Sequence, residues 1–550
     1  MNDDYIENRN NNYNKNKLNI QNFKEIALNR NLTLRKNKIT EIINLKRFKI
    51  PSTTKTYAID INKLNAPETI KNDYKTYLKS FDIKTLFQPL NNQENNINNL
   101  KLALFLLRNY LLLQIEEIPQ KQRKLSRNDY DLIKLIVNYL NYNDKEVQYE
   151  ASWILILLCD FPKNIEKRLH NEENIEKINN FVFNNDIILA ENGIYLISNL
   201  CMEDCNEQKK LIDLNVLKYL ENLLKNKNLI EKTVLNISRA AFYLTNNFVN
   251  ENNIFDYYES MSNIVCNFLH YFLKVSKEQF VKDEENLFYF FKIVTMLIQF
   301  EENKIIDYLC KNNFLYNFYL FFRKFQEKDT ISNYVDVLIN LCSYDDSFAR
   351  NLIDAGYLIL IKELIDKYKF SDLLMLRDLL FSLSNLSLGP MLNIEDVNNM
   401  ELYSDTIKIF KIYSTTNYIE HDIEIKNVLY ECIYVLNNAI CGAQDKLIYD
   451  LLVIDNYQLI YIYKFVFEKL IDYKRDKFMD SCIISLYKIY NSSENVMNDN
   501  EPIKDLILKE GLIDLVEKIL NRGRLSEPVN KYGYMLIEGI KNNEDFNLNI

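Results

Sequence analysis

Glycine and proline are scarce in this sequence, which has only eight of each in 550 residues. Both residue types interrupt helices, so their scarcity indicates that most of the chain is helical. The scarcity of glycine also leaves little room for the glycine-rich loops that bind phosphate groups. Apolar residues make up 47% of the chain, which is enough to build a continuous hydrophobic core.

Histidine is rarer still, with three widely separated residues, His170, His270 and His421. They form no pair at metal-binding spacing, and the His-Glu-x-x-His motif is absent. The closest cysteine pair, Cys201 and Cys205, lacks the partner ligands of a zinc site. Carboxylates are plentiful but do not converge with a nucleophile. We therefore expect no enzyme activity, no cofactor and no metal.

Long apolar runs and disulfide spacings are also missing. The longest apolar runs, such as 102–107 and 154–158, are far shorter than the ~18 residues of a membrane-spanning helix. The polar N-terminus has no secretory signal. The nine cysteines are odd in number and lie in apolar helical runs. We expect buried, reduced thiols in an intracellular protein that does not span a membrane.

A short pattern recurs along the chain: an aromatic residue followed, four residues later, by asparagine. Residues four apart lie on one face of a helix. The complete copies are Tyr195–Asn199, Phe242–Asn246, Phe381–Asn385 and Tyr434–Asn438, whereas Asp336–Asn340 lacks the aromatic residue and Trp153–Leu157 lacks the asparagine. The last residues of successive copies, from Leu157 to Asn438, are 42, 47, 94, 45 and 53 residues apart, and 94 corresponds to two steps of 47. Periods of about 40–47 residues are typical of HEAT and armadillo repeat arrays.

A second feature recurs in phase with this pattern. A glycine or asparagine lies sixteen to eighteen residues after the last residue of a copy of the pattern. These positions are Asn215, Asn313, Gly356 and Asn456, and Gly511 opens a later repeat. Both residue types tolerate positive φ, so we expect each position to form a sharp turn between two short helices.

The charge of the chain is unevenly distributed. Residues 1–50 contain eleven Lys/Arg and five Asp/Glu, a net charge of +6, so the rest carries −15 of the total of −9. We expect residues 1–21 to be disordered, 22–50 to form a basic segment, 51–85 to be a linker and 86–550 to form the repeat array. From charge alone, the basic segment could equally be a solvated helix or a nucleic-acid-binding tail. The negative charge of the array disfavours direct binding of nucleic acid.

Several segments resemble the importin-α (karyopherin-α) family of nuclear transport adaptors. Gln148-Tyr-Glu-Ala-Ser-Trp153 resembles the entry to that family's first cargo-binding tryptophan, and Glu431–Gly442 resembles its motif Glu-x-x-Trp-x-x-x-Asn-Ala-x-x-Gly. Glu510–Glu538 is similar to the family's last repeat, and Leu34–Arg47 resembles its importin-β-binding segment. The resemblance covers nearly the whole chain beyond residue 22. It implies an all-α fold, a right-handed α-solenoid of about ten armadillo repeats that follows a basic N-terminal segment.

The resemblance also implies a binding mechanism. Asparagine amides bind the backbone of an extended peptide, aromatic faces bracket its lysine stems, and acidic groups select lysine. The peptide-binding residues so implied are Trp153, Tyr195, Asn199, Glu203, Phe242, Asn246, Asn340, Asp346, Phe381, Asn385, Glu431, Tyr434 and Asn438. The carrier-binding residues so implied, which can also fold back onto the array as an autoinhibitory segment, are Arg35, Lys36, Lys38, Lys46 and Arg47.

The sequence departs from the family pattern in ways that affect its ligand. Only Trp153 remains of the family's tryptophan ladder, and tyrosine and phenylalanine are weaker cation–π partners. Leu157 has replaced a backbone-binding amide, and Arg30 stands alone where the family has an arginine cluster. We expect a divergent member of the family, whose preference for cargo is weaker or shifted. The second half of the array retains the family pattern better than the first half.

Our leading prediction is a nuclear import adaptor that binds basic nuclear localisation signals and links them to an importin-β-type carrier. The family further implies an export receptor at the closing repeats, and shuttling between cytoplasm and nucleus. The alternative is an armadillo-repeat scaffold, cytoskeletal or signalling, that binds a non-basic peptide. Aromatic residues at helical spacing are more often core than ligand sites, and the asparagines could instead tie neighbouring helices together.

Overall fold

The structure is a computed structural model. It describes residues 57–64, 66–79, 83–86, 89–90, 96–118, 129–159, 161, 169, 172–201, 216–225, 231–245, 255–274, 284–299, 303–343, 346–415, 422–470, 476–497, 501–522 and 527–541. These residues belong to two units, an N-terminal unit within Phe48–Asn317 and a C-terminal unit within Phe318–Ile550. The described part of both units is helical and contains no strand.

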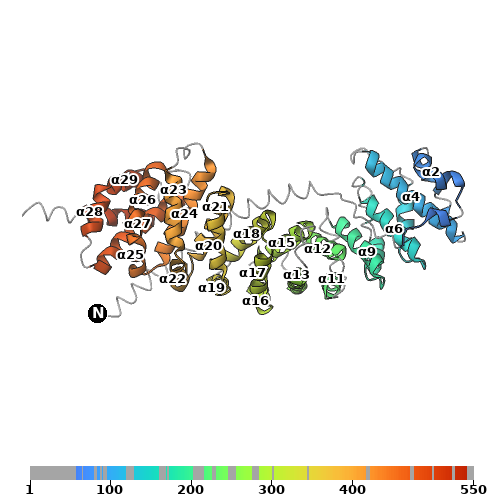
Figure 1. The fold of residues 1–550 in the computed structure, drawn as a ribbon, viewed down its shortest axis with the longest axis horizontal. Helices are drawn as coiled ribbons and strands as arrows, with labels where there is room; N and C mark the ends of the chain where they lie inside the picture. The colour runs from blue at the N-terminus through green and yellow to red at the C-terminus, as the bar shows by residue number, and fades with distance from the viewer. Residues whose placement is uncertain are drawn as a thin grey trace, which may run out of the picture. The chain divides into compact units, whose positions relative to one another are not determined.

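The N-terminal unit contains a row of long helices, each of which packs against the next (Figure 1). We call them, and their counterparts in the C-terminal unit, the ladder helices. Here they are α4 (Ile97–Glu117), α6 (Lys145–Leu158), α9 (Ile187–Leu200), α12 (Glu231–Thr245) and α15 (Glu284–Gln299). A second row contains α5 (Asp129–Tyr139), α8 (Glu172–Val182), α11 (Val216–Leu224), α13 (Phe255–Lys274) and α16 (Asn303–Lys311). Each second-row helix packs against a ladder helix, so apolar side chains of both rows share one core.

The C-terminal unit repeats a group of three helices. Its ladder helices are α18 (Lys328–Cys342), α21 (Leu373–Leu386), α24 (Ile423–Gly442), α27 (Asp476–Met497) and α30 (Glu527–Lys541), and each packs against the next. Two shorter helices precede each of the last four: α19 (Asp346–Asp354) and α20 (Tyr357–Tyr368), α22 (Met391–Asn399) and α23 (Leu402–Ser414), α25 (Asp445–Val453) and α26 (Gln458–Lys469), and α28 (Glu501–Lys509) and α29 (Leu512–Leu520). α17 (Phe314–Lys324) spans the division between the units. This three-helix repeat confirms the predicted all-α, armadillo-like solenoid.

Ladder helix α9 is apolar on nearly every side because it is covered on nearly every side. In α9, every residue from Leu189 to Leu200 is buried. A helix that contacts neighbours in its own row and in the second row has no wide solvent-facing stripe. Any polar side chain on a ladder helix must therefore find a partner inside the fold.

The expected sharp turns lie where the sequence places them. Asn313, Gly356, Asn456 and Gly511 have φ values of 54°, 91°, 56° and 69°, and each lies between the first and second helix of a repeat. Asn215 lies outside the described residues. The left-handed backbone reverses the chain within a few residues, which keeps the two short helices against one ladder helix.

The linker expected over residues 51–85 needs correction from residue 57 onward. This stretch forms the 3₁₀ helices η2 (Ile61–Lys63) and η3 (Ile83–Leu86) and the α-helix α2 (Glu68–Lys79). Pro67 does not mark a flexible segment; its carbonyl accepts the first helical hydrogen bonds of α2, from Ile70 and Lys71. Proline suits the start of a helix because the amide it lacks would have no intrahelical partner there.

Two further properties concern the described part of the chain. None of its helices is long and apolar enough to cross a membrane. It also holds no group of three or more His, Cys, Asp or Glu side chains that could bind a metal ion.

Candidate peptide-binding surface

The sequence-predicted aromatic residues and asparagines lie on consecutive ladder helices of each unit. Trp153 lies on α6, Tyr195 and Asn199 on α9, Phe242 on α12, Asn340 on α18, Phe381 and Asn385 on α21, and Glu431, Tyr434 and Asn438 on α24. Asp346 is the first residue of α19. Glu203, Asn246, Arg35, Lys36, Lys38, Lys46 and Arg47 lie outside the described residues.

The asparagines of the C-terminal unit donate hydrogen bonds within the chain. The Asn385 side chain donates to the Ser343 Oγ at the end of α18, 2.7 Å away. Asn438 donates to the backbone oxygen and the Oγ of Ser384 on α21, at 2.9 and 3.1 Å. Asn340 donates to Asp336 on its own helix. These amide groups tie α21 to α18 and α24 to α21, and the Oδ1 of Asn385 and Asn438 accepts no hydrogen bond from the described residues.

The aromatic residues of the two units differ in exposure. Phe381 and Tyr434 in the C-terminal unit are half-buried. Tyr434 packs edge-on against Phe478 of α27, with ring centroids 5.4 Å apart. The half-exposed rings leave apolar surface that a peptide side chain could cover.

An acidic cluster lies beside these rings. The Arg377 guanidinium, one turn before Phe381, is 2.8 Å from the Asp378 carboxylate and 3.2 Å from that of Glu424 on α24. Burial by itself lowers the pKa of Arg377, but the charges of Asp378, Glu424 and Glu431 outweigh it and raise this pKa. Glu431 is only 1% exposed. Three carboxylates facing one guanidinium give the cluster a net charge of 1 − 3 = −2 when all are ionised.

In the N-terminal unit, the corresponding aromatic residues are buried. Trp153 packs between Tyr149 and Tyr195, with ring centroids 6.3 Å apart on both sides. Phe242 packs against Tyr243 at 5.1 Å and against Tyr289 of α15 at 5.6 Å. The rings form one group on α6 and α9 and a second group on α12 and α15.

Arg239 contacts one ring of each group. Its guanidinium carbon lies 5.0 Å from the ring centroid of Tyr195 and 5.9 Å from that of Tyr243. Its Nη2 donates to the Asn199 Oδ1 at 3.1 Å. Arg239 is only 7% exposed. The amide predicted to bind a ligand is thus bound to a cation of the same chain.

Arg239 is not among the residues predicted to bind a ligand, although its position in the repeat carries a signal. Arg239 lies three residues before Phe242, as Glu431 lies three before Tyr434 and Asp378 three before Phe381. The equivalent residue before Trp153 is Glu150. A change from acid to base at this repeated position was visible in the periodic pattern.

An extended segment of the chain covers the first turns of α6. The Ile59 amide donates to the Glu150 Oε1 at 3.1 Å, and the Tyr57 hydroxyl donates to Asp186 at 2.7 Å. Arg108 of α4 lies 3.1 Å from the same Glu150 oxygen. Burial raises the pKa of Glu150, although Arg108 and the Ile59 amide act against this. This end of the ladder already binds a piece of backbone from its own chain.

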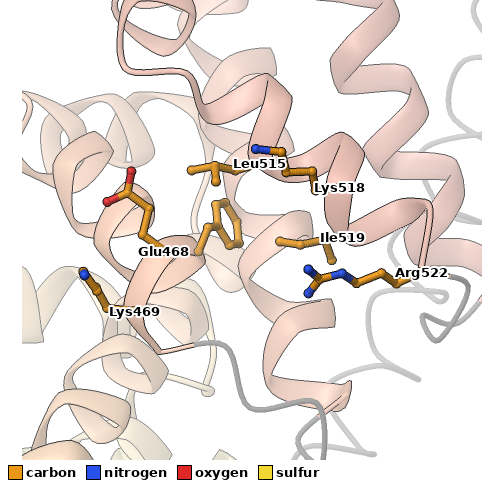
Figure 2. Close-up of a pocket in the computed structure, with 7 residues that line it drawn as sticks. Glu468, Lys469, Leu515, Lys518, Ile519 and Arg522 are labelled. Atoms are coloured by element: carbon orange, nitrogen blue, oxygen red, sulfur yellow. The ribbon is translucent and has the colours of Figure 1, made fainter. Parts of the chain in front are cut away.

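A hollow of 390 Å³ lies between α26 and α29 in the C-terminal unit. Phe467, Leu515 and Ile519 supply its apolar surface, and Glu468, Lys469, Lys518 and Arg522 supply its charged groups. Figure 2 shows Arg522 extending from the end of α29 toward the middle of the hollow. Three basic groups around an apolar floor suit a partner that combines an apolar side chain with a carboxylate.

Comparisons with known proteins support the fold alone. No protein-family model matches the chain, and no curated protein matches it. One similar solved structure is an engineered protein from the Northeast Structural Genomics Consortium. It has a TM-score of 0.58 and 15% identity, and the match covers 84% of this chain and 99% of that one. Another is described as computationally designed armadillo repeat proteins for modular peptide recognition. It has a TM-score of 0.37 and 16% identity, and the match covers 46% of this chain and 99% of that one.

Proposed function

We propose that this chain is a nuclear import adaptor that binds a basic, extended peptide of a cargo protein along its ladder helices. The sequence resemblance to the importin-α adaptors and the helical repeat fold support the proposal. In this function, Arg35, Lys36, Lys38, Lys46 and Arg47 bind an importin-β-type carrier. An export receptor binds the closing repeats, where the basic hollow between α26 and α29 offers a contact for an acidic group. The protein shuttles between cytoplasm and nucleus.

The surface of α21 and α24 is the observation on which the proposal depends. It presents the half-buried rings of Phe381 and Tyr434, whereas Asn385 and Asn438 are only 5% and 6% exposed. Arg377, Asp378 and Glu424 are partly exposed, with side-chain exposures of 20%, 26% and 33%. A lysine side chain needs apolar contact for its stem and a negative potential for its ammonium, and this surface supplies both.

A second candidate function is a scaffold that binds a non-basic peptide. Arg239 favours it, because a buried cation beside Asn199 opposes the binding of a second cation there. The two candidates differ in the ligand that the whole chain prefers.

Binding of a lysine-rich peptide by the full chain tests the proposal. We expect fluorescence anisotropy to show binding of the peptide and loss of binding when its lysines are replaced by alanine. Asp378→Asn together with Glu424→Gln neutralises two acids and should weaken binding by roughly tenfold, because both charges are partly exposed. Glu395→Gln together with Asp450→Asn is the matched control, since it removes the same charge from exposed positions on α22 and α25.

Two results would contradict the adaptor function. One is that the wild-type chain binds the lysine-rich peptide no better than its alanine version. The other is that the control pair weakens binding as much as the α21–α24 pair, which would mean a diffuse charge effect.

A further inference from the structure

The surroundings of Arg239 have the composition expected of a binding site for a basic residue. Two tyrosine rings flank the guanidinium, and an asparagine side chain accepts a hydrogen bond from it. Tyr195 and Asn199 come from α9, whereas Arg239 and Tyr243 come from α12. Aromatic faces and an amide oxygen are the groups through which the predicted site would bind a lysine or arginine of a ligand.

We infer that Arg239 permanently occupies the aromatic–amide site of the N-terminal unit, so that a basic residue of a ligand is excluded there. This inference rests on the proposed function and refines it: recognition of basic peptides belongs to the C-terminal unit. Arginine remains protonated throughout the physiological range, so the occupant carries its charge at all times. A second cation at the same rings would meet like charge in a site shielded from water, where repulsion is strong.

The residues around Arg239 are buried. Tyr195, Tyr243 and Arg239 are 4%, 4% and 7% exposed, so a ligand has almost no access to the two tyrosine rings while Arg239 contacts both. The Nδ2 of Asn199 is also buried, and among the described residues it has no hydrogen-bond partner. The Asn199 amide therefore accepts a hydrogen bond from Arg239 but donates none to the described residues.

The C-terminal unit lacks this arrangement at its equivalent positions. Asp378 and Glu431 stand where Arg239 stands in the repeat, three residues before the aromatic residue. Arg377 is one residue further back, and it pairs with Asp378 and Glu424 instead of the asparagines. The residue at this repeated position is basic on α12 and acidic on α21 and α24, and the basic side chain closes the site on α9.

Replacement of Arg239 tests the inference in the full chain. Arg239→Ala frees the two rings and the Asn199 Oδ1, and it should tighten binding of the lysine-rich peptide by about tenfold in the Asp378→Asn, Glu424→Gln background. Arg239→Lys keeps a cation in place and should give no gain. Circular dichroism melting establishes that each variant is folded.

A second measurement does not depend on the folding of a variant. A lysine-rich peptide that carries a photoreactive group beside its lysine should cross-link to α21 or α24 of the wild-type chain. Cross-links to α9 or α12 of the wild type would overturn the inference, and so would a folded Arg239→Ala chain that gains no affinity.

The outcomes separate the inference from the proposed function. If the wild type binds no basic peptide but Arg239→Ala does, the inference holds and the adaptor function fails. If the wild type binds through α21 and α24 but Arg239→Ala gains nothing, the inference fails and the adaptor function stands. If neither chain binds a basic peptide, both fail.

Discussion

Residues with positive φ form the turns between the two short helices of the repeats. The residue between the first and second helix has positive φ in four successive repeats of the C-terminal part, at Gly356, Glu401, Asn456 and Gly511. Glycine adopts this backbone without strain, whereas a side chain with a Cβ meets the following carbonyl oxygen. Glu401, at φ 60°, adopts this strained backbone conformation. The sequence did not predict a turn at Glu401, since glutamate has no special tolerance for the conformation.

Exchanging residue types at these turns should change stability in opposite directions. Gly511 has no atom within 4 Å of a built Cβ, so Gly511→Ala introduces backbone strain without a clash. We expect it to lower the free energy of unfolding by about 1–2 kcal/mol, and we expect Glu401→Gly to raise it by about 1 kcal/mol. Urea denaturation followed by circular dichroism measures both changes.

A matched control checks that backbone conformation is the cause. Glu395 is exposed within α22, so Glu395→Gly should be destabilising by about 0.5–1 kcal/mol, the opposite of Glu401→Gly. Equal effects at the two positions would show that positive φ does not govern stability here.

At the scale of elements, aspartates cap several ladder helices. Asp144, Asp186, Asp372 and Asp422 precede α6, α9, α21 and α24, and each accepts a hydrogen bond from a backbone amide in the first turn. An aspartate at this position satisfies an amide that lacks an intrahelical partner and interacts favourably with the helix dipole. The caps fix where each ladder helix begins.

Removal of the Asp372 cap should destabilise the chain in a pH-dependent way. Burial raises the pKa of Asp372, but the amides of Met375 and Leu374 and the Lys328 ammonium together lower it below its usual value. A lowered pKa means that the carboxylate contributes stability above the usual aspartate pKa and loses it as the pH falls through the folded-state value. We expect Asp372→Ala to cost about 1 kcal/mol at pH 7 and less at pH 3 in urea denaturation.

Asp372→Asn separates the cap from the charge. The amide oxygen still accepts the Met375 hydrogen bond, so this variant should retain most of the stability and lose the pH dependence. An equal loss for asparagine and alanine at pH 7 would mean that the cap contributes little.

At the scale of the whole molecule, the continuous core of each unit protects its cysteines. Burial raises the pKa of Cys266 in the N-terminal unit and of Cys482 in the C-terminal unit to about 12. Cys432 is also fully buried, and its pKa is raised further. Thiols with these pKa values hold almost no thiolate at neutral pH, and the thiolate is the reactive form.

Alkylation at pH 8 should therefore report the folding of each unit. We expect iodoacetamide to leave Cys266, Cys432 and Cys482 unmodified in the native chain and to modify them at the denaturant concentration that unfolds their unit. Peptide mass spectrometry quantifies each site. The half-buried Cys310 is the internal reference, and modification of Cys482 as fast as that of Cys310 in native conditions would contradict a closed core.

The sequence by itself determined the helical fold, the repeat period and most of the turns. These properties depend on local chemistry: glycine and proline are scarce, apolar residues recur with the helix, and Gly356 and Gly511 tolerate positive φ. The predicted aromatic residues and asparagines that the structure describes also lie on ladder helices, because residues four apart share a helix face whatever surrounds them.

Only the tertiary structure decided what those side chains contact. Arg239 and Asn199 are 40 residues apart, and Tyr57 and Asp186 are 129 apart. Whether an asparagine meets a ligand or an arginine of the next helix depends on the register between two packed helices, which no local pattern specifies. The charge at one position of the repeat is positive on α12 and negative on α6, α21 and α24, and its consequence becomes visible only when the neighbouring helix is in place.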